Sequence, residues 1–229
     1  MPHLKRIVVP PLWKSWDIMA QKSGLRSKVY SLNGDEYKGE WLDNKKHGKG
    51  IQIYKKDSAI YEGGWRYGKR DGYGIYSKLL PETKEYVKKY DGDWKNGKKH
   101  GYGKLYYSDT SSYEGNFIGD KRSGWGKMHY DNGDTYSGDW LDDKCHGQGT
   151  LLLANENCYE GTWKEGKKHG YGKFYYMNKG VLYEGCWLDG VAKSGTLSDF
   201  GRDEAPMPTA YPIPKLHLLD KTSVSIEVA

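Results

Sequence analysis

Residues 37–50 read Tyr37-Lys38-Gly39-Glu40-Trp41-Leu42-Asp43-Asn44-Lys45-Lys46-His47-Gly48-Lys49-Gly50. The frame of this stretch is Tyr-x-Gly-x-Trp, then six residues, then Gly-x-Gly, and it returns along the chain at intervals of 23 to 29 residues. A fixed period in this range is typical of a repeat architecture. The repeated tyrosine and the ring four residues after it occur as Tyr37 and Trp41, Tyr61 and Trp65, Tyr90 and Trp94, Tyr113 and Phe117, Tyr136 and Trp140, Tyr159 and Trp163, and Tyr183 and Trp187.

Each repeat is predicted to form a β-hairpin. Tyr37, Gly39 and Trp41 stand two residues apart, so they share one face of a strand, while the charged residues between them take the other face. The polar stretch 43–47 is predicted as the turn, and Gly48 as the start of the second strand. Glycine weakens a strand unless another group approaches the backbone closely. We therefore predict that a glycine between two rings, such as Gly39, leaves a slot for a ring of a neighbouring strand, and that the rings form a continuous stripe.

The composition favours a thin sheet over a thick core. Only 36% of the 229 residues are hydrophobic and the mean hydropathy is −0.91, yet 14% are aromatic and 31 are glycine. A globular domain draws on about 45–50% apolar residues, and disordered chains are poor in aromatic residues. The predicted fold class is therefore all-β, an elongated single-layer antiparallel β-meander of stacked hairpins. Leucine-rich repeats need a leucine ladder, and propeller blades need about 40–50 residues each, so both alternatives fit less well.

The predicted organisation has four parts. Residues 1–12 are an N-terminal extension, and residues 13–36 are a half repeat that caps the array, because Trp16 is followed at the repeat's offset by Lys22-Ser23-Gly24. Seven repeats fill residues 37–200: 37–60, 61–89, 90–112, 113–135, 136–158, 159–182 and a degenerate 183–200. Residues 201–229 are a tail with four prolines between 206 and 214, which docks on a partner or covers the edge of the last repeat.

Charge and cysteine content limit the classes of function. Lys and Arg number 36 and Asp and Glu 30, so the net charge is +6, which is too small for a nucleic-acid binder that works through a basic tail. The three cysteines show no CxxC spacing, which argues against a disulfide framework or a zinc site and favours a reducing compartment. No stretch approaches the ~20 apolar residues of a membrane span. A soluble, intracellular protein is expected.

A row of basic residues is the candidate binding surface. These residues follow the aromatic position of each repeat at a fixed offset: Lys45 and Lys46, Lys69 and Arg70, Lys98 and Lys99, Lys121 and Arg122, Lys144, and Lys167 and Lys168. Stacking in register would place them along one edge, about 10 Å apart. Two interpretations stay open. The row binds an acidic partner, such as phosphoinositide head groups, a tubulin surface or another acidic protein, or it only keeps the turns soluble.

Catalytic, metal and cofactor sites are not predicted. The turn histidines lie in separate repeats, too far apart to share a metal ion. The Gly-x-Gly pairs lack the following helix and Lys-Ser/Thr of a phosphate-binding loop. A single sheet offers no deep pocket for a small-molecule substrate, and the rings that could stack on nucleic-acid bases are needed by one another. We therefore expect no enzyme activity, no cofactor and no nucleic-acid partner.

The pattern Tyr-x-Gly-x-Trp-x₆-Gly-x-Gly resembles the MORN repeat (membrane occupation and recognition nexus), over about four fifths of the chain. Six repeats keep the signature, with Phe117 as the one substitution. Residues 12–17, 24–27 and 199–206 are also similar to the flanks of a short family member of testis and ciliated cells that has no catalytic domain.

The resemblance implies a non-enzymatic scaffold that bridges axonemal or microtubule-associated proteins, located in the cytoskeleton of cilia or sperm flagella. Two alternatives stay open. One is a module that binds anionic phospholipid, as the family name indicates. The other is an adaptor of developing sperm, in the acrosome, the cytoplasm or cytoplasmic vesicles.

Overall fold

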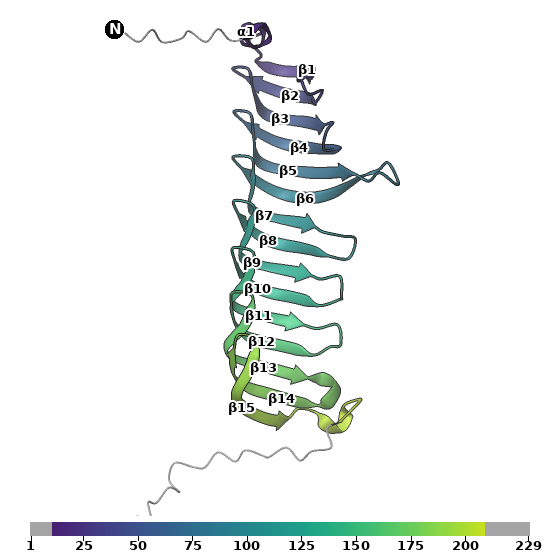
Figure 1. Cartoon of the computed structure of the whole chain (residues 1–229), viewed down its shortest axis with the longest axis vertical. Helices are drawn as coiled ribbons and strands as arrows, with labels where there is room; N and C mark the ends of the chain where they lie inside the picture. Colours follow the sequence, from purple (N-terminus) through teal and green to yellow (C-terminus); the bar gives the residue numbers. More distant parts are fainter. Residues whose placement is uncertain (1–10, 209–229) are drawn as a thin grey trace, which may run out of the picture. The chain divides into compact units, whose positions relative to one another are not determined.

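The structure, a computed structural model, describes residues 11–208. Helix α1 (Leu12–Met19) precedes strands that follow chain order as neighbours in one open antiparallel sheet, and the predicted all-β, single-layer meander is confirmed (Figure 1). The strands are β1 (Gly24–Tyr30), β2 (Glu36–Leu42), β3 (Lys45–Tyr54), β4 (Ala59–Arg66), β5 (Lys69–Leu79), β6 (Tyr86–Lys95), β7 (Lys98–Tyr106), β8 (Ser112–Ile118), β9 (Lys121–His129), β10 (Thr135–Leu141), β11 (Lys144–Leu152), β12 (Cys158–Lys164), β13 (Lys167–Tyr176), β14 (Val181–Leu188) and β15 (Val191–Asp199).

The described chain divides into two compact units. The N-terminal unit comprises residues 11–109 and 114–121, and the C-terminal unit comprises residues 110–113 and 122–208. Two short 3₁₀ turns, η1 (Met177–Lys179) and η2 (Arg202–Glu204), lie in the C-terminal unit. Most of the predicted N-terminal extension, and the predicted tail beyond residue 208, lie outside the described residues.

The turn of each hairpin is shorter than the sequence pattern predicts. Only two residues join β2 to β3, Asp43 and Asn44, and both have positive φ, 47° and 61°. This is the backbone of a type I′ turn, whose twist matches that of the flanking strands. The prediction that the second strand begins at Gly48 is wrong, because β3 already begins at Lys45. Gly48, at φ 61°, instead lies in a bulge that shifts the register of the pair, and this left-handed conformation favours glycine.

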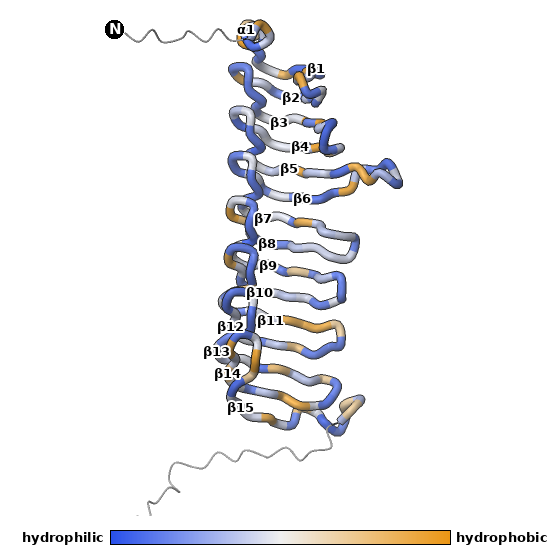
Figure 2. Tube along the Cα trace, viewed as in Figure 1, coloured by the Kyte–Doolittle hydropathy of each residue, from blue (hydrophilic) through white to orange (hydrophobic). Residues whose placement is uncertain are grey.

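The slot for a ring lies at the second glycine of each Gly-x-Gly, and the prediction that the glycine between two rings forms it is wrong, because a Cβ atom on Gly39 would lie 2.5 Å from the Cα atom of Gly50. Gly50 pairs with Gly39 across β2 and β3, and a Cβ atom on Gly50 would lie 2.2 Å from the hydroxyl oxygen of Tyr37. A side chain there would displace the buried Tyr37 ring. The same arrangement recurs at Gly74 against Tyr61. In Figure 2 the strands are mostly pale, because Tyr, Trp and Gly lie near the middle of the hydropathy scale.

Within each unit the rings form the predicted continuous stripe. Neighbouring rings stand nearly perpendicular, at 80–90°, with centroids 5.0–5.4 Å apart, which is a favourable edge-to-face geometry. The contacts of the N-terminal unit join Trp41, Tyr37, Trp65, Tyr61, Trp94, Tyr90 and Phe117 in that order. Those of the C-terminal unit join Tyr113, Trp140, Tyr136, Trp163, Tyr159, Trp187 and Tyr183.

The polar atoms of these rings donate hydrogen bonds to backbone carbonyls. The Tyr61 hydroxyl donates to the carbonyl of Gly64 at 2.9 Å, and the Trp94 indole N–H donates to the carbonyl of Gly74 at 3.0 Å. Buried polar groups need such partners. At the ends of the array the pattern fails, and the indole nitrogens of Trp41 and Trp187 have no hydrogen-bond partner among the described residues.

The two ends of the repeat array are altered in different ways. The sequence predicts Trp16 to be part of a half repeat, but it lies in helix α1 instead of a strand, and its side chain is exposed. Gly24 of β1 pairs with Trp41 of β2, just as Gly48 of β3 pairs with Trp65 of β4. In the seventh repeat, Gly195 pairs with Gly185, so the glycine pair survives although the strand is one residue shorter after the turn.

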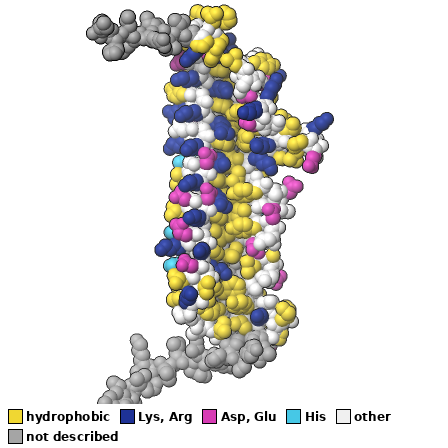
Figure 3. Space-filling view, in the orientation of Figure 1, with side chains coloured by type: hydrophobic (Ala, Val, Ile, Leu, Met, Phe, Trp, Pro, Cys, Tyr) yellow, Lys and Arg dark blue, Asp and Glu magenta, His cyan; other side chains and the backbone are white. Residues whose placement is uncertain are grey.

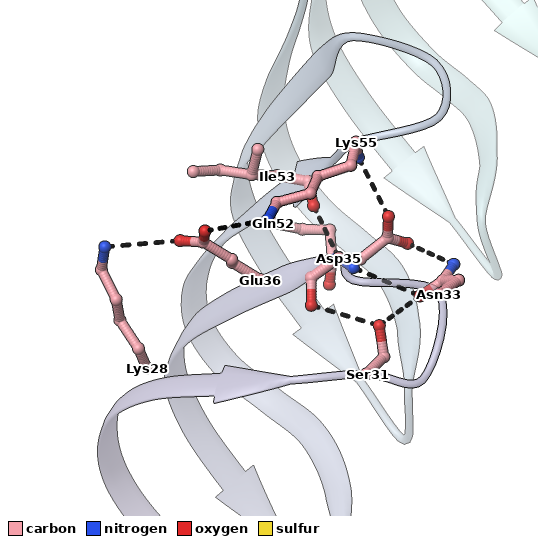
Figure 4. A network of polar contacts seen from close by, with 8 residues as sticks. All are labelled: Lys28, Ser31, Asn33, Asp35, Glu36, Gln52, Ile53 and Lys55. Atoms are coloured by element: carbon pink, nitrogen blue, oxygen red, sulfur yellow. Dashed lines mark hydrogen bonds and ion pairs between the residues drawn. The ribbon is translucent and has the colours of Figure 1, made fainter.

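Asn-Gly-Asp segments form the opposite ends of two hairpins. In the β1–β2 connection, Asn33 Nδ2 donates to Asp35 Oδ2 at 2.9 Å, and the N–H of Lys55 donates to Asp35 Oδ1 at 3.0 Å (Figure 4). Lys28 and Lys55 also form ion pairs with Glu36. The segment 132–134 repeats the Asn-to-Asp bond at 2.9 Å. These connections therefore anchor each loop to the following one.

Candidate functional site

The predicted basic row lies at the hairpin tips, meaning each two-residue turn together with the strand residues that flank it. Because the second strand begins directly after the turn, the two residues of each basic pair point to opposite faces of the sheet. The first residue is exposed in every repeat: Lys45, Lys69, Lys98, Lys121, Lys144 and Lys167. The second is only partly exposed or buried, and lies on the face with the rings: Lys46, Arg70, Lys99, Arg122, Cys145 and Lys168.

The inner cations pack on the aromatic stripe. The Arg70 guanidinium lies 3.9 Å from the centroid of the Trp94 ring, and that of Arg122 lies 4.2 Å from the Trp140 ring. The ammonium of Lys168 lies 4.9 Å from the Trp187 ring. These are cation–π distances. Burial lowers the pKa of Lys46 and of Lys168. The inner half of the row therefore stabilises the fold.

A repeated backbone bond places each tip beside the next. The second residue of a turn donates its N–H to the carbonyl of the inner basic residue of the preceding hairpin: Gly97 to Arg70 at 2.8 Å, and Asp143 to Arg122 at 3.1 Å. The same bond joins Asn44 to Lys22, which lies over the Trp41 ring at 5.1 Å and so occupies the inner position of the N-terminal half repeat. The turn of one hairpin therefore decides which groups face the cations of the hairpin before it.

Acidic turn residues pair with two of the cations at the tips of the C-terminal unit. Arg122 pairs with Asp143, with 3.1 Å between Nε and Oδ1, and Lys144 pairs with Glu165. In the N-terminal unit the turn between β4 and β5 is Tyr67-Gly68, and the turn between β6 and β7 is Asn96-Gly97. These turns carry no carboxylate.

At the tips of β4–β7 the inner Lys99 lies 3.9 Å from Asp120, but the exposed cations gather without carboxylate partners among the described residues. Arg66 stands opposite Lys69, and Lys95 stands opposite Lys98, as like-charged cross-strand pairs. Such pairs destabilise a sheet. None of these four residues has a carboxylate ion partner among the residues that the structure describes. In Figure 3 the tip edge of the N-terminal unit shows a column of Lys and Arg side chains.

A surface hollow of about 630 Å³ lies at these tips, and we call it the tip hollow. Arg66, Lys69 and Lys95 line it, together with Asp71 and Asp93. The N–H of Asn96 donates to Asp71 Oδ2 at 3.2 Å, and the N–H of Tyr102 donates to Asp93 Oδ2 at 3.3 Å. The two carboxylates are thus engaged by the backbone, whereas the three cations are exposed.

A second surface was missed in the sequence. The middle residue of Gly-x-Gly points away from the ring stripe and, where it is aromatic, forms an exposed row: Tyr73 and Tyr102 in the N-terminal unit, and Trp125 and Tyr171 in the C-terminal unit, each 50–58% exposed. The Tyr73 hydroxyl donates to Asp91 and the Tyr102 hydroxyl donates to Glu114. These bonds raise the pKa of both tyrosines. The sequence signal for this surface is that the middle residue of Gly-x-Gly differs from repeat to repeat while the two glycines recur.

Within residues 11–208, His, Cys, Asp and Glu form no group of three that could hold a metal ion. No helix in this range is long and apolar enough to cross a membrane. Cys145 takes the inner tip position of its repeat, and burial raises the pKa of its thiol to about 11. That thiol is therefore protonated at neutral pH and contributes packing.

Comparison with known proteins agrees with this geometry. The family model for the MORN repeat matches residues 37–58, 61–78, 90–112, 113–135, 136–158 and 159–181. The chain is 70% identical to MORN repeat-containing protein 3 of Homo sapiens over 216 residues, which is 94% of this chain and 90% of the relative. It is 67% identical to that of Mus musculus over 98% of this chain and 93% of the relative, and 58% identical to that of Xenopus laevis over 93% and 90%. The chain belongs to the MORN repeat family.

Proposed function

We propose that this protein is a non-enzymatic scaffold that bridges proteins in the axoneme of cilia or sperm flagella. The observation that carries the proposal is the row of exposed rings on the face opposite the ring stripe. Tyr73 and Tyr102 are each about half exposed and held in place by hydrogen bonds to carboxylates on the neighbouring strand. Exposed aromatic side chains of fixed orientation are favoured at protein interfaces.

The repeat core supports the same proposal. Its tyrosines, tryptophans and glycines are used to pack against one another, so the residues that vary between repeats are those on the outer face and at the tips. Aromatic anchors carry a large part of the binding energy at protein interfaces. A partner that binds along a unit would contact such a residue once per repeat.

The test is fractionation of ciliated cells that express the tagged protein. We expect the protein to sediment with detergent-extracted axonemes and to leave them only at high salt. Y73S combined with Y102S should move it to the soluble fraction, while Y86S, which changes an equally exposed tyrosine away from the row, should not. Wild-type protein found wholly in the detergent-soluble fraction would exclude the axonemal proposal and favour the adaptor of the acrosome or cytoplasm.

A second candidate function is binding to an anionic phospholipid surface. The like-charged pairs at the tips of β4–β7 favour it, because each Lys or Arg near such a surface adds about 1 kcal/mol. Liposome flotation with charge reversal at the exposed residues Lys45, Lys98 and Lys167 tests it. The inner residues are left unchanged, because they pack on the rings and their reversal would disturb the fold. Unchanged flotation after reversal would exclude the row as a lipid site.

A further inference from the structure

The tip hollow contains positive charge that the fold does not use. Arg66 and Lys69 face each other across β4 and β5, and Lys95 lies on the next hairpin at the rim of the same hollow. Since the like-charged pair repels and lacks a carboxylate partner among the described residues, an anion bound between these side chains would relieve the repulsion. The inner cation Arg70, by contrast, is already placed over the Trp94 ring.

The donors of the hollow fit a phosphate group better than a single carboxylate. A guanidinium presents a planar fork of N–H groups that matches phosphate oxygens, and an ammonium acts as a point charge beside it. A phosphorylated serine or threonine carries about −1.5 to −2 charge at neutral pH and three acceptor oxygens. Three cations on two adjacent hairpins can each contact one of these oxygens. The volume of about 630 Å³ leaves room for residues on both sides of the phosphate.

The two carboxylates of the hollow select against an extended anionic surface. Asp71 and Asp93 lie among the lining residues, fixed by backbone N–H groups at 3.2 and 3.3 Å. A bilayer or a run of acidic residues would meet these charges as well as the cations, and like charges repel. A single phosphate on a peptide can contact the cations alone.

We infer that the tip hollow binds a phosphorylated serine or threonine in an extended segment of a partner protein. Arg66, Lys69 and Lys95 bind the phosphate, and the rim of the hollow binds the flanking residues. This inference rests on the scaffold function proposed above, since it specifies the chemistry of one partner. The site is separate from the exposed aromatic row.

Fluorescence anisotropy with the purified full chain tests the inference. The probe is a labelled pool of decapeptides with one central phosphoserine and random flanks, and the reference is the same pool with serine. We expect the phosphorylated pool to bind about tenfold or more tightly. R66Q and K69Q should each remove most of this difference, while K69R, which keeps the charge, should retain it. The matched controls are K164Q and K167Q, which change the like-charged pair of the C-terminal unit and should leave binding unchanged.

Four outcomes overturn the inference. The first two are equal binding of the two pools and an equal loss of binding in the control variants. The third is competition by inorganic phosphate at the concentration of the peptide, and the fourth is stronger competition by vesicles that contain phosphatidylinositol bisphosphate than by unlabelled phosphopeptide. The third would indicate a general anion site, and the fourth would indicate a membrane site. Because the anisotropy measurement uses purified protein, a negative result in it does not change the result expected from the axonemal fractionation. A negative fractionation likewise does not change the result expected from the anisotropy measurement.

Discussion

The hairpin tips of β4–β7 in the N-terminal unit and those of β10–β13 in the C-terminal unit have the same backbone and different charges. In both, a two-residue turn of positive φ precedes an exposed basic residue. Glu165 in a turn of the second region pairs with Lys144 of the preceding hairpin, while Asn96 takes the corresponding turn position in the first region, after Lys69. The backbone φ of Glu165 and of Asn96 is nearly the same, 52° and 53°. The turn residue therefore sets the charge of a tip without changing its structure.

The two regions therefore share the backbone geometry of the repeat and differ in the charges at their tips. The rings and glycines are spaced alike in both regions, so we expect the two units to respond alike to any change in the core. The tips differ in whether the next turn supplies a carboxylate to the exposed cation, as Glu165 does for Lys144 and Asn96 does not for Lys69, so we expect a different response only to changes in charge. Four measurements test this division, beginning with the largest expected effect.

Alkaline pH should unfold both units together. Burial raises the pKa of Tyr61 and Tyr90 in the N-terminal unit and of Tyr136 in the C-terminal unit, and raises that of Tyr159 there to about 12. A tyrosine of the unfolded chain ionises near pH 10 while these stay protonated, so the stability they contribute is complete below pH 10 and is lost as pH rises through their raised pKa. Each contributes up to about 1.4 kcal/mol per pH unit.

Hydrogen exchange read by mass spectrometry between pH 9 and 12, with exchange rates corrected for pH, measures this loss in each unit. Lys46 and Lys168, whose pKa is lowered by burial, act in the opposite sense only up to about pH 10.4, where an unfolded lysine also loses its proton. Protection that persists at pH 12 in one unit alone would show that the two cores are not equivalent.

Loss of a core tryptophan should destabilise either unit to the same degree. Trp94 and Trp140 are both buried, and each contacts two tyrosines edge-to-face. Each also donates its indole N–H to a glycine carbonyl. W94A and W140A should each lower the free energy of unfolding by about 3–5 kcal/mol. Urea denaturation of both variants checks this, with W125A, an exposed tryptophan, expected to cost below about 1 kcal/mol. A cost confined to one variant would contradict the shared core.

The core was predictable because its signal is local and repeated. The spacing of Tyr61, Gly63 and Trp65 places all three on one face, and the second glycine leaves the ring slot, so the pattern contained both the strands and their packing. Helix α1 was not predictable in the same way. Trp16 and Gly24 imitate the spacing of a repeat, and no buried face marks the helix, whose side chains are largely exposed.

The tips were only partly predictable, because two facts about them are not local. The two-residue turn pairs Arg70 with Trp65 across the strands, and this pairing decides that Lys69 faces outward while Arg70 packs on Trp94. The partner of each cation comes from the next hairpin, 21 residues away for Arg122 and Asp143. A basic pair in the sequence therefore does not reveal which of its residues is available to a partner.

The inner cations should matter for stability in both regions, and the outer ones should not. R70A removes a guanidinium that lies over Trp94 and donates to the carbonyl of Gly97 at 3.0 Å, and R122A removes the equivalent contact with Trp140. Each should cost about 1–2 kcal/mol, since these cations are partly shielded from water and their stems also pack. K69A should change the free energy of unfolding by less than about 0.5 kcal/mol. Equal costs for R70A and K69A would refute the division of the row into two faces.

Exchanging the turn residues should exchange the charge of the two tips, and we expect this to be the smallest of the four effects. N96E places a carboxylate where Glu165 stands in the other region, within reach of Lys69, and E165N frees Lys144. N96E should weaken binding of the phosphoserine pool by up to about fivefold at low salt, because exposed charges interact weakly. The effect should fall at high salt, where exposed charges are screened. N96Q, which adds length without charge, is the matched control. If N96Q weakens binding as much as N96E, the turn acts by shape, and the charge difference between the two regions is not what distinguishes their tips.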